Sequence, residues 1–215
     1  MPGVITLDNS SDSICYLCTK DKRLAKVINT IGPISYSVHD DKYTFLIHEI
    51  IEQMLSIKAG QTIYRKLEDL CEGEITPQRI ILLSDEEIKS TGTSWAKVSY
   101  IRSLTEAIIS RQLNLDDIES MTDDDVIKIL TSIRGIGPWS AKMYLIFALN
   151  RPDVLPYEDV AFLQGFCWLY KTDDRSKKTV ISKCKKWSPY ASIAARYMYK
   201  AVDLGLTKTE FHLFK

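Results

Sequence analysis

The sequence lacks the long apolar runs of a membrane protein. No stretch approaches the roughly 20 apolar residues that a membrane-spanning helix requires. The first residues, MPGVITLDNSSDS, carry neither the basic nor the apolar stretch of a secretory signal. We therefore expect no membrane partner and an intracellular protein, in the cytoplasm or nucleoid of a bacterium or the nucleus of a eukaryote.

Cysteine is also scarce. The five thiols are scattered and odd in number, which excludes the regular disulfide framework of small secreted domains. Cys15 and Cys18 form one C-x-x-C pair, but a structural zinc site needs about four ligands. No second close cysteine pair exists, and the three histidines are dispersed. We expect no zinc and no organic cofactor.

An excess of positive charge is missing as well. The 28 lysines and arginines balance 28 aspartates and glutamates, whereas many DNA-binding domains are strongly basic. The charges are segregated, however: residues 175–186 are basic and residues 116–125 are acidic. A protein without net charge can still bind DNA through backbone amides and a local basic patch.

Strand signals are nearly absent, and helical periodicity runs through most of the chain. In residues 43–55, for example, Leu46, Ile50 and Met54 lie on one apolar helical face. We expect an all-α fold over residues 1–215 with two helical lobes and a central cleft, and short strands only at residues 4–7 and 34–38. The main helices are expected at residues 24–31, 43–55, 58–71, 95–110, 123–133, 138–149, 159–170, 175–187 and 189–204.

One helix–turn–helix segment has the chemistry of an anion site. Residues 130–143 read LTSIRGIGPWSAKM, so that one helix ends, Gly135 and Gly137 form a turn, and Pro138 begins the next helix. Glycine permits positive φ and close approach of another backbone. The amides of the turn and of the new helix N-terminus can bind a DNA phosphate. A Gly-x-Gly corner without any ligand is the alternative.

The residues around this turn resemble a known family. The segment IRGIGPWSAKMYLIFALNRPDVLPYED, with WSPYASIAARYMY and EQMLS elsewhere, resembles the helix-hairpin-helix DNA glycosylases, and most of all their 3-methyladenine DNA glycosylase II branch. The resemblance extends from about residue 17 to residue 199, with the hairpin motif at about 123–149. It implies a monomeric base excision repair enzyme that flips an alkylated base out of double-stranded DNA and hydrolyses its N-glycosidic bond. The alternatives are a non-catalytic protein that binds DNA structures and a glycosylase for oxidised or mismatched bases.

The family's catalytic aspartate falls on Asp159, in PYEDVAF. Cleavage of an N-glycosidic bond builds positive charge on the sugar, which a nearby carboxylate stabilises. An aspartate at this place also caps the following helix, and the two roles are compatible.

The resemblance assigns the remaining site residues. Trp139 is expected to stack on a cationic alkylated base, and Met54 to wedge into the duplex where the target nucleotide leaves. The expected base pocket consists of Trp139, Met143, Val160 and Tyr199. The expected DNA contacts are Gln53, Met54, Arg134, Gly135, Ile136, Gly137 and Ser140. The expected ligands of a structural sodium or potassium ion are the main-chain carbonyls of Thr131, Ile133 and Ile136.

The sequence also predicts the class of mechanism. Bifunctional relatives carry a lysine two positions after the second hairpin glycine, where it forms an imine with the sugar. Trp139 stands at that position here, and Lys142 lies three residues further along the helix. We therefore expect a monofunctional glycosylase that leaves the abasic strand intact.

Overall fold

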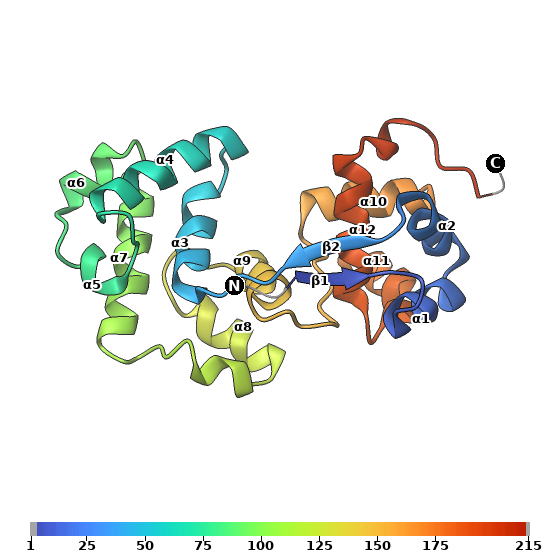
Figure 1. Ribbon diagram of the computed structural model, residues 1–215, viewed down its shortest axis with the longest axis horizontal. Helices are drawn as coiled ribbons and strands as arrows, with labels where there is room; N and C mark the ends of the chain where they lie inside the picture. The colour runs from blue at the N-terminus through green and yellow to red at the C-terminus, as the bar shows by residue number, and fades with distance from the viewer. Residues whose placement is uncertain (1–3, 214–215) are drawn as a thin grey trace. The chain divides into compact units, whose positions relative to one another are not determined.

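The computed structural model describes residues 4–213, which form two compact units. Unit 1 consists of Met1–Val38 together with Asn150–Lys215, and unit 2 is His39–Leu149. Both are mainly helical, as the sequence predicted, and unit 1 also contains a small antiparallel sheet (Figure 1). No helix within residues 4–213 is both long enough and apolar enough to cross a membrane.

Unit 1 packs its helices and sheet around a hydrophobic core of aliphatic and aromatic side chains. Its elements are β1 (Val4–Leu7), α1 (Asp12–Lys20), α2 (Lys22–Ile31), β2 (Ile34–Ser37), α10 (Val160–Tyr170), α11 (Lys177–Cys184) and α12 (Ala191–Asp203). The two strands pair from Val4 with Ser37 to Leu7 with Ile34. Helices α10 and α12 pack closely, since a Cβ on Gly165 would lie 2.9 Å from the Cβ of Met198.

Unit 2 contains the hairpin and the helices that support it. Its elements are α3 (Lys42–Glu52), α4 (Ile57–Leu70), α5 (Pro77–Ile80), α6 (Asp85–Ser90), α7 (Trp95–Ile109), α8 (Asp123–Thr131) and α9 (Pro138–Met143). A π-helical turn, Tyr144–Ala148, continues α9. Figure 1 shows the chain passing from α8 through a short turn into α9.

Many helices of both units begin at a side chain that caps the helix N-terminus. The carboxylate of Asp21 accepts hydrogen bonds from the first amides of α2, and Ser84 forms a complete capping box with Glu87 at α6. Thr76, Ser94 and Thr122 cap α5, α7 and α8 through their hydroxyl oxygens. Each side chain satisfies an amide that has no acceptor within its own helix.

The helix ends differ more from expectation. Helix α3 ends at Glu52 instead of continuing to residue 55, because Gln53 is extended and Met54 has a φ of 58°. Helix α8 ends at Thr131, and the second hairpin helix is α-helical only as far as Met143. Helix α1 was not predicted at all.

Candidate DNA-binding and catalytic site

The hairpin is the turn between α8 and α9. Its loop is closed by two backbone hydrogen bonds, from the Ile133 amide to the Leu130 carbonyl and from the Ile136 amide to the Ile133 carbonyl, both 3.1 Å. Gly137 then caps α9, and its carbonyl accepts from Ala141 at 3.0 Å. The predicted helix–turn–helix is therefore present, with a helix N-terminus directly after the glycine turn.

The two hairpin glycines have different structural roles. Gly135 has a φ of 93°, and a Cβ there would lie 2.2 Å from the ring of Tyr100, on α7. The fold itself therefore requires glycine at this position. Gly137 has an ordinary φ of −95°, and a Cβ there would meet nothing within 4 Å. Unit 2 leaves open space beside Gly137, which is where a bound phosphate would approach the amides of α9.

Two side chains connect the hairpin to the end of α3. The side-chain amide of Gln53 donates to the Gly135 carbonyl at 2.9 Å and approaches the Ser140 hydroxyl at 3.5 Å. The ammonium of Lys97, on α7, donates to the carbonyls of Ile51 at 2.8 Å and Gln53 at 2.6 Å. Burial lowers the pKa of Lys97. The side-chain amide of Gln53 binds the hairpin in this structure, and the DNA contact expected for Gln53 stays a prediction.

Met54 projects from the turn that this network supports. Its side chain is 102% exposed, the highest value among the large apolar residues that are exposed, and its backbone is left-handed. Sequence periodicity placed Met54 on the apolar face of α3, and that interpretation is wrong because the helix ends two residues earlier. A methionine with a left-handed backbone and a fully solvated side chain adds nothing to the stability of the fold. Such a conformation is consistent with a side chain that contacts a ligand.

Asp159 is the N-cap of α10, in unit 1. Its Oδ1 accepts a hydrogen bond from the Phe162 amide at 2.7 Å, and the residue is only 9% exposed. The positive end of the helix stabilises a negative charge at this position. Nearby Asp153 has a structural role, because its carboxylate binds the Ser188 hydroxyl and the Ala191 amide. Asp159 is thus a fixed, largely desolvated carboxylate.

The predicted pocket residues are divided between the two units. Trp139, half-buried, and Met143, buried, belong to α9 in unit 2. Val160, 73% exposed, and Tyr199, half-buried, belong with Asp159 to unit 1. Lys142 is buried, with 7% of its surface exposed.

The predicted cation ligands lie at the end of α8 and in the hairpin loop. The carbonyls in the last turn of a helix lack intrahelical donors, so that of Thr131 is chemically suited to a monovalent cation. The Ile133 carbonyl already accepts one bond, from Ile136, and keeps a second lone pair. Within residues 4–213, no cluster of His, Cys, Asp or Glu could hold a metal ion.

Sequence reasoning missed Lys97 and Tyr100. Both lie on α7, and both hold the hairpin region through contacts with residues distant in sequence. Periodicity shows only which face of a helix is buried, so no local signal marks either residue.

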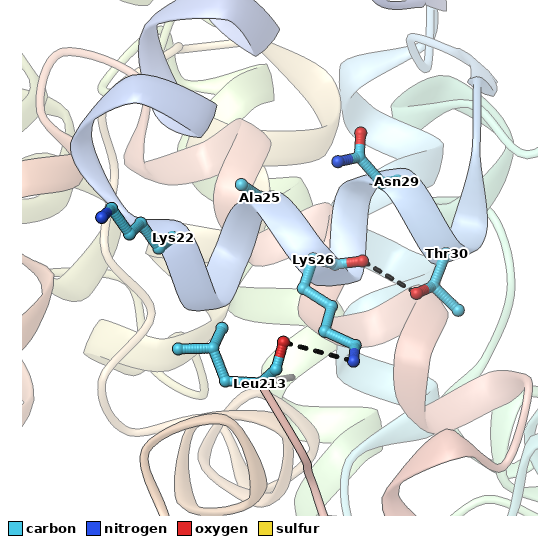
Figure 2. Close-up of a pocket in the computed structure, with 6 residues that line it drawn as sticks. All are labelled: Lys22, Ala25, Lys26, Asn29, Thr30 and Leu213. Carbon is cyan, nitrogen blue, oxygen red and sulfur yellow. Dashed lines mark hydrogen bonds between the residues drawn. The ribbon is translucent and has the colours of Figure 1, made fainter. Parts of the chain in front are cut away.

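Unit 1 also has a hollow between α2 and the C-terminal segment, of about 480 Å³. Figure 2 shows Lys26 reaching the Leu213 carbonyl, at 3.4 Å, while the side chain of Lys22 points another way. The lining is Lys22, Ala25, Lys26, Asn29, Thr30 and Leu213. None of the predicted site residues lines this hollow, and among residues 4–213 no carboxylate lines it.

Comparison with known proteins places these features in a family. A model of the HhH-GPD superfamily base excision DNA repair proteins matches residues 47–189. DNA-3-methyladenine glycosylase 1 of Schizosaccharomyces pombe is 30% identical over 188 residues, which cover 86% of this chain and 82% of that protein.

Solved structures agree with this match. The crystal structure of a DNA-3-methyladenine glycosidase from Bacillus halodurans is similar with a TM-score of 0.87 and 32% identity, and the match covers 97% of each chain. The Schizosaccharomyces pombe 3-methyladenine DNA glycosylase in complex with abasic DNA has a TM-score of 0.80 and 27% identity, over 90% of this chain and 97% of that one. The chain belongs to the HhH-GPD superfamily of base excision DNA repair proteins.

Proposed function

We propose that this protein is a monofunctional DNA glycosylase that removes alkylated bases from double-stranded DNA, acting inside the cell as a monomer. The observation that carries the proposal is Asp159, a buried carboxylate held at the N-terminus of α10. Two relatives support the substrate class, each matched over most of its length: DNA-3-methyladenine glycosylase 1 of Schizosaccharomyces pombe and the DNA-3-methyladenine glycosidase of Bacillus halodurans.

The proposed chemistry follows from a fixed negative charge. As the bond between sugar and base breaks, positive charge develops on the sugar ring. The Asp159 carboxylate stabilises that charge and orients the attacking water, and its hydrogen bond to Phe162 prevents it from turning away. An alkylated purine carries a positive charge before cleavage, so it leaves without a strong general acid.

The other predicted residues bind and position the DNA. Met54 fills the space that the extruded nucleotide leaves, and the amides around Gly137 hold a backbone phosphate. Trp139 and Tyr199 supply aromatic faces for the base, and Met143 and Val160 supply further apolar surface. A sodium or potassium ion on the carbonyls of Thr131, Ile133 and Ile136 would add positive charge to the hairpin.

The test is release of bases from methylated DNA, resolved by chromatography, for the wild type and Asp159→Asn. Asparagine caps a helix about as well as aspartate, so the variant is expected to fold. We expect it to bind abasic DNA and to lose excision by orders of magnitude. Near-normal excision by the variant would contradict the role of Asp159. DNA binding without any base release by the wild type would favour the non-catalytic alternative.

A further inference from the structure

A groove of about 400 Å³ runs along α7 beside the hairpin in unit 2. Of the residues assigned above, only Arg134, in the hairpin loop, lines it. Its lining consists of Asp85 from α6, Trp95, Val98, Ser99, Arg102, Ser103 and Glu106 from α7, and Arg134 from the hairpin loop.

The hairpin loop packs directly against α7. The guanidinium of Arg134 lies 6.0 Å from the ring centroid of Tyr100, and the same ring is the surface on which Gly135 rests. One end of the groove is therefore continuous with the loop that presents amides to DNA. A strand bound at the hairpin has Arg134 as its neighbouring cation.

Trp95 lies at the N-terminal end of the groove, five residues before Tyr100 on α7, and its indole is unusually exposed. It is the first residue of α7, after the N-cap Ser94, and 55% of its surface is exposed. Tryptophan is on average a highly buried residue, and exposed aromatic surface beside polar groups is typical of binding sites. Ser99 follows one helical turn later on the same face.

The charges that line the groove favour binding of an anion near Trp95. Arg102 is engaged within the protein: its Nε binds the Asp85 carboxylate at 2.7 Å, and its Nη1 binds the Ile80 carbonyl at 2.8 Å. Glu106 lies eleven residues after Trp95, about 16 Å along the helix axis, and repels phosphate. A polyanion therefore crosses the groove near Trp95 and Arg134 and does not follow it to Glu106.

We infer that this end of the groove is a second contact with the DNA backbone. Arg134 pairs with a phosphate, the Ser99 hydroxyl donates to the same phosphate group, and the Trp95 indole packs on the adjoining deoxyribose or base. The inference rests on the proposed function only in requiring that the hairpin binds DNA. The contact is independent of sequence and of the lesion, because it uses the backbone and an aromatic face.

The test measures binding to an undamaged duplex over a range of salt concentrations. Trp95→Ala is expected to weaken binding by about tenfold, the scale of one lost packing contact of an aromatic side chain, without changing the salt dependence. Arg134→Ala is expected to weaken binding and to reduce the slope of log K against log salt by about one. Leu82→Ala removes another exposed apolar side chain of unit 2, outside the groove, and is expected to bind like the wild type.

Further measurements separate this contact from catalysis and folding. The thermal midpoint of Trp95→Ala should match that of the wild type, so that its weaker binding is not a loss of folding. Wild-type affinity in Trp95→Ala would overturn the inference, and so would an equal loss in Leu82→Ala. If the wild type excises no base while Trp95→Ala still weakens DNA binding, the proposed function is wrong but the DNA contact at the groove is supported.

Discussion

The ammonium of Lys97 donates to the main-chain carbonyl of Gln53 at 2.6 Å, and the side-chain amide of Gln53 donates to the hairpin at Gly135. Lys97 and Gln53 thus connect three segments that are distant in sequence: the end of α3, the start of α7 and the glycine turn. The exposed turn of Met54 depends on this connection, because the carbonyls that Lys97 binds are those of the last turn of α3 and of its C-cap.

Lys97→Met should remove the connection while keeping the apolar stem. Bonds from a charged donor contribute about 1.5–3 kcal/mol, so we expect a thermal midpoint lower by about 3–12 °C for a chain of this size. Excision from duplex DNA should fall as well, since the Met54 turn loses its support. Lys66→Met, on the exposed side of α4, is the control. The same loss in Lys66→Met would show that only charge matters.

Met54→Gly is expected to separate stability from function. Glycine adopts a positive φ without strain, so the variant should be at least as stable as the wild type. Without the side chain, excision from a duplex should fall, while excision from a single strand, which needs no wedge, should not change. Glu72→Gly is a matched control, because Glu72 also has a positive φ, of 53°. Full duplex activity in Met54→Gly would contradict the wedge.

Alanine at the two hairpin glycines should have opposite effects. Gly135→Ala collides with Tyr100 and forces a strained φ, so we expect a large loss of thermal stability. Gly137→Ala meets no protein atom and should cost about 1 kcal/mol or less as a changed N-cap. Its affinity for DNA should nevertheless fall, equally for all sequences, because the methyl group occupies the approach to the amides. Unchanged affinity in Gly137→Ala, or a loss for selected sequences only, would count against phosphate binding here.

The buried carboxylate of Asp21 gives a prediction about pH. Burial alone would raise its pKa, but hydrogen bonds from Tyr170, Trp187 and Lys186 outweigh burial and lower it. The two bonds from Trp187 and Lys186 are both 3.0 Å. Because the folded-state pKa lies below the unfolded value of about 3.9, the carboxylate stabilises the fold above that pH and loses this contribution as the pH falls further.

Asp21→Asn is therefore expected to lower the free energy of unfolding at pH 7 by about 1.5–3 kcal/mol, the scale of hydrogen bonds to a charged group. Urea titrations of both proteins should show this difference shrinking below about pH 4. Asp203→Asn, at the end of α12, serves as the comparison. A difference that stays constant down to pH 3 would contradict the assignment.

Borohydride trapping distinguishes the two mechanistic classes. Trp139 has no amine with which to form an imine, and Lys142 is buried and about 300° around the helix from it. We expect an intact abasic strand as the product, cut only after alkali or a separate endonuclease is added. A trapped protein–DNA adduct that disappears in Lys142→Met would place the protein among the lyases.

Helix starts and the hairpin could be predicted because their signals are local. Asp21, Ser84 and Thr122 cap helices with their own side chains, and Pro138 follows the glycine turn directly. The end of α3 could not be predicted, because Met54 continues the apolar period of the helix. What stops the helix is a left-handed backbone and a lysine from α7, and neither is encoded nearby.

Within the candidate site, the sequence predicted only those residues that the family resemblance assigns. Asp159 was assigned by its motif, and the structure adds that it is buried and hydrogen-bonded to Phe162. Gly135 was expected to bind a ligand, yet the fold itself requires glycine there, because a side chain would collide with the ring of Tyr100. The roles of Lys97 and Trp95 depend on contacts and exposure in three dimensions, which no sequence period reports.

Unit 1 is formed by two separate segments of the chain, and this affects the order in which the protein folds during synthesis. Leu17 and Leu24 are buried in a core whose other members include Phe166 and Tyr197, and unit 2 is encoded between the two sets. A ribosome therefore releases all of unit 2 before α10 and α12, which complete the core around α2, have been made. Unit 2 is one continuous segment and can begin to fold at that point. The first helices of the chain are among the last to be enclosed.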